Sequence, residues 1–211
     1  MPRQVRQALV VLIETERLLL RPVEMADIDE FVALHDDPEV TRFIWRFDRS
    51  AAEQRLRQAE LEWSERGHGM FAVLDRAGER FLGRAGLRYW PQFDETEVGW
   101  VLRQDAWGHG YATEAARACI DRGFASLAVP YLTAMIHPGN ERSIRLARRL
   151  GLSPLRTDVL LDTAVVVHAL TREDWPSTDL IARVPETEEE IAEAKHLAVD
   201  AIHDEPWERW W

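Results

Sequence analysis

The alternation of apolar and polar side chains is clearest over residues 96–102, where Val98, Trp100 and Leu102 fall on one side of the chain. A period of two residues predicts a β-strand. Alternation, or a short apolar run bounded by turn residues, predicts further strands elsewhere. They cover residues 16–22, 70–74, 80–89, 131–137, 157–161 and 164–170.

Apolar residues at helical spacing predict helices between these strands. They cover residues 27–36, 50–66, 111–126 and 140–150. Asp27 and Asn140 are good N-caps for the first and the last of them, and Gly151 is a natural end for the last. We therefore expect one folded body, residues 1–176, that closes near Trp175-Pro176.

The strand at residues 96–102 leads to a glycine turn, Gly108-His109-Gly110, that opens directly into a predicted helix. At such a helix start, backbone N–H groups without helical partners converge beside the positive end of the helix dipole. This geometry binds anions, so the stretch predicts a cradle for a diphosphate.

Composition limits the class of protein. The chain has 211 residues, 46% hydrophobic and 30% charged, which suits one domain with a real core. Its longest apolar run near the start, residues 8–13, is too short for a signal peptide or a membrane span, so we expect a cytoplasmic protein without a membrane partner. The single cysteine, Cys119, excludes an intrachain disulfide and a Cys-based metal site, and its helical register suggests a small buried residue.

The net charge of −11 is concentrated in the tail, because residues 173–211 carry 12 acidic and 3 basic side chains. The nearly neutral remainder has no basic stripe of the kind that binds nucleic acid. Residues 177–211 are predicted to form an acidic helical extension that ends in Pro206-Trp207-Glu208-Arg209-Trp210-Trp211. The tryptophans are expected to pack on the body, on a neighbouring subunit in a possible homodimer, or on a separate partner.

Two common glycine motifs do not fit the predicted cradle. A dinucleotide-binding G-x-G-x-x-G needs a small third residue where this chain has Thr113, and an acidic ribose partner that does not stand out. A phosphate-binding G-x-x-x-x-G-K-[ST] loop needs a lysine, and the only lysine is Lys195 in the tail.

Three segments in order carry a more specific pattern: TERLLLRP at residues 15–22, EVGWVL before WGHGYATEA within residues 97–115, and NERSI before LGL within residues 140–152. Together they resemble the GNAT superfamily of acyl-CoA N-acyltransferases, and within it the RimJ/RimL type. The resemblance covers about residues 14–172. It implies an α/β fold with a mixed sheet flanked by helices, splayed between strands 96–102 and 131–137, with acetyl-CoA as donor and its pantetheine in the gap.

The resemblance also implies roles for single residues. The backbone of Trp100, Val101 and Leu102 would pair with the pantetheine arm, and Asn140 would hydrogen-bond it. The turn amides would bind the pyrophosphate through Gly108, His109, Gly110, Tyr111, Ala112 and Thr113. Asp105 stands where many relatives have Gln or Arg, so we expect its side chain to turn away from the diphosphate. Ala147 stands where many relatives have a tyrosine that protonates the thiol.

Acyl transfer to an amine needs a neutral nucleophile, a polarised carbonyl group and a proton for the departing thiolate. Glu97 is the candidate base, directly or through a water; otherwise it is a solvated or ion-paired strand carboxylate. Ser143 matches the RimJ/RimL serine placed near the thioester sulfur and is the candidate acid or hydrogen-bond donor to the sulfur; otherwise it is an ordinary helix residue. His109 and His137 are expected to be structural or phosphate contacts.

The acceptor stays open between two classes of primary amine. A protein or peptide α-amine fits the RimJ/RimL resemblance, and a small amine such as an antibiotic or polyamine fits aromatic walls at Trp45, Phe47, Tyr89 and Trp90. The aromatic connector at residues 43–47 either lines such a pocket or pins a loop to the core. We expect direct transfer in a ternary complex; the alternative is a GNAT-fold protein that holds acyl-CoA without turnover and acts through its tail.

Overall fold

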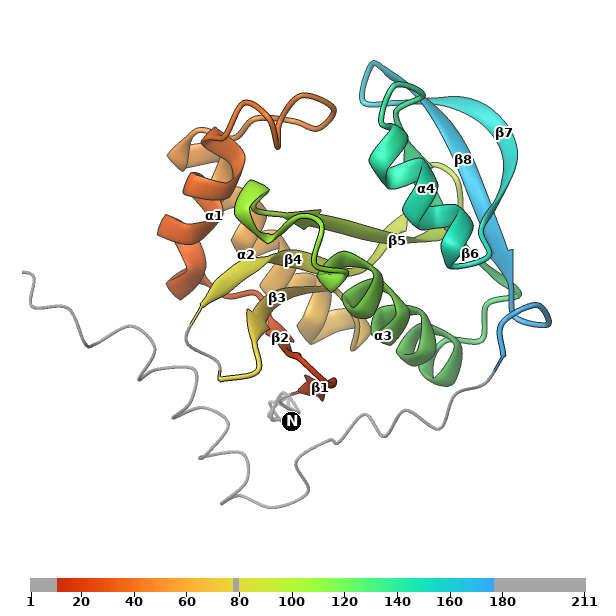
Figure 1. Ribbon diagram of the computed structural model, residues 1–211, viewed down its shortest axis with the longest axis horizontal. Coiled ribbons are helices and arrows are strands. Elements are labelled where there is room, and N and C mark those ends of the chain that lie inside the picture. Colours follow the sequence, from red (N-terminus) through yellow and green to blue (C-terminus); the bar gives the residue numbers. More distant parts are fainter. Residues whose placement is uncertain (1–10, 78–79, 177–211) are drawn as a thin grey trace, which may run out of the picture.

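The computed structural model describes residues 11–77 and 80–176. Over these residues an eight-stranded mixed sheet, in the order β1-β2-β3-β4-β5-β6-β8-β7, is flanked by helices (Figure 1). The strands are β1 Ile13–Glu14, β2 Leu18–Pro22, β3 Met70–Asp75, β4 Phe81–Trp90, β5 Glu95–Leu102, β6 Tyr131–Ile136, β7 Ser153–Leu160 and β8 Thr163–Thr171. The helices are α1 Ile28–Asp36, α2 Arg49–Arg66, α3 Tyr111–Ser126 and α4 Glu141–Arg149, with short 3-10 turns at Met25–Asp27 and Gln104–Ala106. The expected α/β fold with a mixed sheet is confirmed.

The core lies on both faces of the sheet. On one face, Ala115, Cys119 and Ile120 of α3 pack against strand residues that include Leu87 and Val98. On the other face, residues of α1 and α2 pack against alternate residues of β3. Figure 1 shows the two layers, with α3 in front of the sheet and α2 behind it.

Most predicted elements are confirmed with small shifts at their ends. The helix predicted over residues 111–126 is α3, and Asn140 caps α4 by accepting a 3.2 Å hydrogen bond at Oδ1 from Ser143 N–H. The cap predicted at Asp27 is wrong in one respect, because its side chain makes no capping bond to α1. It instead forms a buried bidentate pair with Arg21, at 2.6 and 2.8 Å, which satisfies both carboxylate oxygens.

The sheet splays after one pair of residues. Strand β5 pairs with β4 along its whole length, but its parallel pairing with β6 is limited to Glu97 and Thr133. Beyond that pair, residues 98–102 have no β6 partner, so part of their backbone is available to another molecule. The splay therefore lies between the two strands that the family resemblance implied.

The predicted tail helix and its tryptophan-rich end lie outside the described residues. Within residues 11–77 and 80–176, no helix is long and apolar enough to cross a bilayer, and no group of three His, Cys, Asp or Glu side chains is arranged to hold a metal ion.

Candidate active site

A cleft of about 1310 Å³ opens at the splay, between the end of β5, the start of α3 and the start of α4. The connector residues Phe43 and Ile44 close it on the side of α1. Of the predicted cofactor residues, His109 is absent from the cleft wall. The wall contains the others: Trp100, Val101, Leu102, Gly108, Gly110, Tyr111, Ala112, Thr113, Asn140 and Ser143.

The glycine turn presents a row of free backbone donors. Gly108 and Gly110 have φ of 82° and 83°, a left-handed conformation that other residues adopt at a cost, and an added Cβ at Gly108 would meet nothing within 4 Å. Among the described residues, the N–H groups of residues 108–112 have no hydrogen-bond acceptor, whereas Thr113 N–H bonds the carbonyl of Gly110. Five free donors at a helix start fit a diphosphate.

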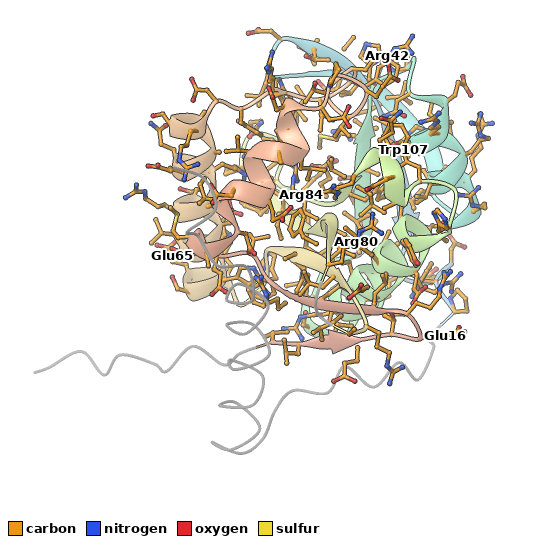
Figure 2. The ribbon with its side chains drawn as sticks, turned by 60° about the vertical axis from the view of Figure 1, so that its left-hand side comes forward. Glu16, Arg42, Glu65, Arg80, Arg84 and Trp107 are labelled. Carbon is orange, nitrogen blue, oxygen red and sulfur yellow. The ribbon has the colours of Figure 1, made fainter. Side chains whose placement is uncertain are left out.

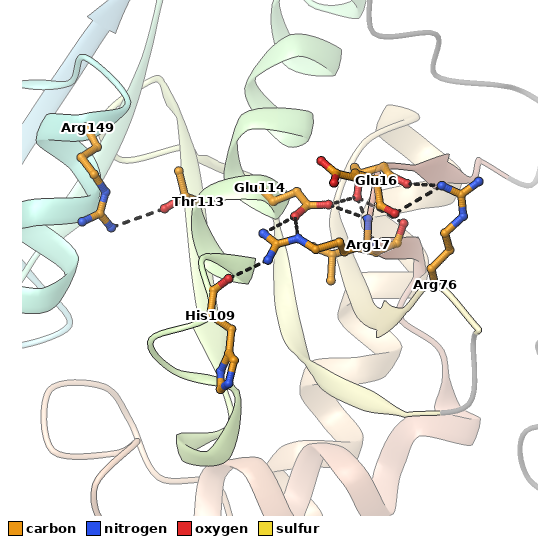
Figure 3. A network of polar contacts seen from close by, with 9 residues as sticks. Glu16, Arg17, Arg76, His109, Thr113, Glu114 and Arg149 are labelled. Atoms are coloured by element: carbon orange, nitrogen blue, oxygen red, sulfur yellow. Dashed lines mark hydrogen bonds and ion pairs between the residues drawn. The ribbon is translucent and has the colours of Figure 1, made fainter.

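Arg17 holds this turn from the outside (Figure 3). Its guanidinium donates to the carbonyl of His109 at 2.8 Å and to Glu114 at 2.8 Å, and its backbone N–H donates to the same carboxylate at 2.9 Å. Thr15 Oγ1 donates to Glu114 at 2.5 Å. The start of the chain's first long strand is therefore tied to the first turn of α3, which fixes the backbone that carries the free donors.

Arginines surround the cleft, and sequence analysis missed them. The wall contains Arg17, Arg42, Arg117, Arg142, Arg145 and Arg149, against the carboxylates of Glu16, Glu39, Glu114 and Glu141. The excess of positive charge suits a ligand with several phosphate charges. Their signal was available, because Arg142, Arg145 and Arg149 recur at the helical spacing of three and four residues and so share one face of α4.

Asn140, Ser143 and Trp100 are linked across the cleft. The side-chain oxygen of Asn140 is used by the helix cap, so its NH₂ group is the part left to face a ligand. Trp100 Nε1 donates to Ser143 Oγ at 3.3 Å, which leaves the hydroxyl proton of Ser143 free to be donated elsewhere. Both side chains therefore keep a donor for the cofactor.

Glu97 lies at the splay but outside the cleft wall. Its carboxylate accepts hydrogen bonds from Trp90 Nε1 at 2.6 Å and from Met135 N–H at 3.2 Å. Burial raises the pKa of Glu97, and those two bonds together with the nearby charges of Arg88 and Arg84 oppose the rise. The side chain is thus a fixed, half-buried carboxylate instead of a solvated one.

Asp105 is turned away from the diphosphate cradle, as expected. Its carboxylate pairs with Arg80 at 2.7 Å and with Arg103 at 3.3 Å, and it does not line the cleft. The hydrogen bond from Arg103 holds the pKa of Asp105 below its ordinary value.

The predicted acceptor aromatics are not gathered into one wall. Trp45 is 36% exposed, and Phe47 packs on Phe31 and His35. Tyr89 donates to Asp94 at 2.7 Å, whereas Trp90 is 5% exposed and bonded to Glu97. None of the four lines the cleft, and their part in acceptor binding stays a prediction.

Cys119 is fully buried in the α3 core, and burial raises its pKa to about 12. A thiol with that pKa is not a thiolate at neutral pH, so it cannot serve as a nucleophile there.

The comparisons with known proteins agree on one family. A family model described as an acetyltransferase (GNAT) domain matches residues 17–153. An uncharacterized N-acetyltransferase, p20 of Bacillus licheniformis, is 33% identical over 141 residues, which cover 65% of this chain and 79% of the relative. A crystal structure of an acetyltransferase from Agrobacterium tumefaciens strain C58 has a TM-score of 0.68 at 29% identity, and covers 76% of this chain and 94% of that chain. The RimL α-N-acetyltransferase of a ribosomal protein, in complex with coenzyme A, has a TM-score of 0.65 at 14% identity, and covers 77% of this chain and 99% of that one.

Proposed function

The chain belongs to the GNAT acetyltransferase family, and we propose that it transfers the acetyl group of acetyl-CoA directly to a primary amine within a ternary complex. The observation that carries this proposal is the row of five free N–H groups at residues 108–112, next to the unpaired edge of β5. Bound acetyl-CoA supplies an acetyl group activated as a thioester. The surrounding residues bind it, orient it and handle the protons.

Glu97 is the proposed base. A lysine-type amine with a pKa of about 10.4 is almost wholly protonated at neutral pH, so a proton must leave before the nitrogen can attack. A half-buried carboxylate with a raised pKa accepts a proton more readily than an exposed one. Glu97 forms the β5 pair with β6 at which the two strands separate. It therefore lies next to residues 98–102, whose backbone is proposed to bind acetyl-CoA.

Ser143 is the proposed donor to the departing sulfur. Its backbone N–H is bound to Asn140 and its hydroxyl oxygen accepts from Trp100, so the remaining hydroxyl proton has a defined range of directions. Ala147 is buried in the core and offers no group for this task. We expect much of the rate to come from such positioning.

We infer further that the acceptor site is of the RimJ/RimL type. Ser143 and the three-segment sequence pattern support this inference, and the likeness to RimL supports the fold alone. Among the described residues, no observation favours a protein that binds acyl-CoA without turnover.

A thiol-release assay tests the proposal. The full chain is incubated with acetyl-CoA and a panel of amines that includes peptides with free α-amino groups, short amines and polyamines. We expect amine-dependent release of free thiol. Tight binding of coenzyme A, without thiol release for any member of the panel, would overturn the catalytic proposal.

A further inference from the structure

A hollow lies on the sheet face that α1 and α2 cover. On this face β4 and β5 place Arg88 opposite Glu97, Gly86 opposite Gly99, and Arg84 opposite Val101. An added Cβ at Gly99 would meet nothing within 4 Å, so the space above Gly99 is open, whereas the backbone of Gly69 and Met70 fills the space at Gly86. The open space at Gly99 lies between Glu97 and Val101 on this face of β5, and Arg88 and Arg84 stand opposite those two residues on β4.

Both guanidinium groups lack a carboxylate partner. Within the ranges that the structure describes, no carboxylate oxygen lies within 4.0 Å of Arg84 or Arg88. Arg84 makes a 3.4 Å contact with His35 Nε2, and its Nε is buried without an acceptor. Arg88 stacks over the Trp90 ring at 3.8 Å. Each side chain is half-buried, so its unused donors are costly unless a ligand accepts them.

The neighbouring charges do not balance the two arginines. Arg55 of α2 is paired with Glu62 at 3.3 Å, and Glu62 also acts on Arg88, so two carboxylates, Glu62 and Glu97, lie near three arginines. His35 adds no further positive charge, because burial and the Arg84 charge lower its pKa to about 3 and keep it neutral. Figure 2 shows Arg84 behind α1, where the helix covers the sheet. The cluster therefore carries an uncompensated positive charge beside the open space.

We propose that the acceptor amine carries a carboxylate, which binds to Arg84 and Arg88 while its amine faces Glu97. The proposal rests on the proposed function and names the substrate class of the same site. Guanidinium groups bind carboxylates through paired, charge-assisted hydrogen bonds, which a neutral amide cannot match. An acceptor that carries both an amine and a carboxylate complements both kinds of charge in this cluster. Its carboxylate accepts hydrogen bonds from the two guanidinium groups, and its amine is held at the carboxylate of Glu97.

The test compares each acid with its own amide. Glycine, β-alanine and 4-aminobutanoate are assayed against their primary amides, and Ala-Glu peptides against Ala-Gln peptides, so that free amino acids and acidic peptides are distinguished. We expect at least one acid to exceed its amide by about 10- to 100-fold in kcat/KM. Arg84→Gln and Arg88→Gln should each bring this ratio close to one. Arg57→Gln, an exposed arginine of α2 paired with Glu53, is the matched control and should leave the ratio unchanged.

A binding measurement separates this proposal from the catalytic one. Calorimetry of the preferred acid with the coenzyme A-loaded protein should show binding that Gly99→Val abolishes, because the new side chain fills the hollow. Thiol release that treats acids and amides alike would overturn the acceptor class but leave the transferase proposal standing. Absence of thiol release, together with calorimetric binding of the acid that needs Arg84, would overturn the transferase proposal and leave the carboxylate site standing.

Discussion

Trp90 Nε1 donates a 2.6 Å hydrogen bond to Oε2 of Glu97. Sequence analysis placed one of these residues in an acceptor wall and the other in the role of base, and the structure joins them. The indole is buried and acts on the carboxylate by holding its orientation and lowering its pKa against the effect of burial. Trp90 is therefore a positioning residue for Glu97.

Glu97→Gln should lower kcat by about 10²- to 10⁴-fold, the usual contribution of a positioned base. Coenzyme A affinity should be unchanged, because Glu97 does not line the cleft. Stopped-assay rates and calorimetry measure the two quantities. A variant that keeps its full kcat would exclude Glu97 as the base.

Trp90→Phe should move the acid limb of the kcat/KM profile to higher pH. The base works when deprotonated, so activity falls as pH drops through its pKa, and loss of the indole bond removes an influence that lowers that pKa. Trp175→Phe is the matched control, since Trp175 Nε1 also donates to a carboxylate, Asp121, at 2.6 Å, outside the cleft. Equal profiles for the two variants would contradict the pairing argument.

Ser143→Ala should lower kcat by about 10- to 100-fold, the value of a hydrogen bond to a developing charge. The dissociation constant for coenzyme A should change little, because the cap bond to Asn140 comes from the backbone N–H and survives. Ser64→Ala, an exposed hydroxyl on α2 that bonds Leu61, serves as control. Kinetics like those of the control would remove Ser143 from the mechanism.

Gly108→Ala should weaken coenzyme A binding, whereas Gly67→Ala should not. Both glycines have positive φ, 82° and 68°, and open space at Cβ, so each substitution should cost about 1–2 kcal/mol of stability through the same backbone strain. They differ in place, since Gly67 ends α2 and Gly108 lines the cleft. Melting curves measure the backbone strain in both variants, and calorimetry measures their affinity for coenzyme A. Equal affinities in the two variants would argue against a role of the Gly108 turn in binding coenzyme A.

Asp105→Asn should leave coenzyme A affinity within about twofold, because the carboxylate is neutralised by two arginines and points elsewhere. The variant tests the departure from the family pattern directly. A tenfold gain in affinity would show instead that the acid opposes the diphosphate.

His35 should make stability depend on pH. Its folded pKa, about 3, lies below the ordinary 6.5, so the unfolded chain binds a proton that the folded chain does not. The contribution of neutral His35 to the free energy of unfolding is complete above about pH 6.5 and is lost as pH falls from there toward 3. Urea unfolding of the protein and of His35→Gln at pH 7.5 and 5 measures it, and the variant should lose less stability between the two values. The same loss in both would contradict the assignment.

The fold was largely predictable, because most helices and strands have a recognisable pattern of apolar, polar and capping residues in their own sequence. The period of two in β5, the apolar face of α3 and the cap at Asn140 are each encoded within a few residues. Asp27 was not predictable in the same way. Its partner, Arg21, lies in the preceding strand, and a local capping rule says nothing of such a pair.

The donor half of the site was more predictable than the acceptor half. Gly108, Asn140 and Ser143 belong to contiguous motifs, and they line one cleft. The acceptor half joins α1, β4 and β5, and the relevant facts are a cross-strand pairing and an arginine whose Nε is buried without an acceptor among the described residues. Aromatic content drew attention to Phe47, whose ring is used for packing on Phe31. Only the register of the sheet places Arg88 opposite Glu97, with Arg84 on the same face opposite Val101.

Because β5 and β6 separate after Glu97 and Thr133, the proposed donor, acetyl-CoA, would occupy a position that a neighbouring strand fills elsewhere in the sheet. β5 is an interior strand of the sheet, but along residues 98–102 its neighbour on the β6 side is expected to be a small molecule. Binding of the donor and folding of the chain are then linked. A ligand that binds only the folded chain raises the free energy of unfolding in proportion to the logarithm of the ligand concentration, once that concentration exceeds the dissociation constant. The free energy of unfolding would therefore rise with the concentration of acetyl-CoA, so one ligand would supply both the reacting group and part of the stability.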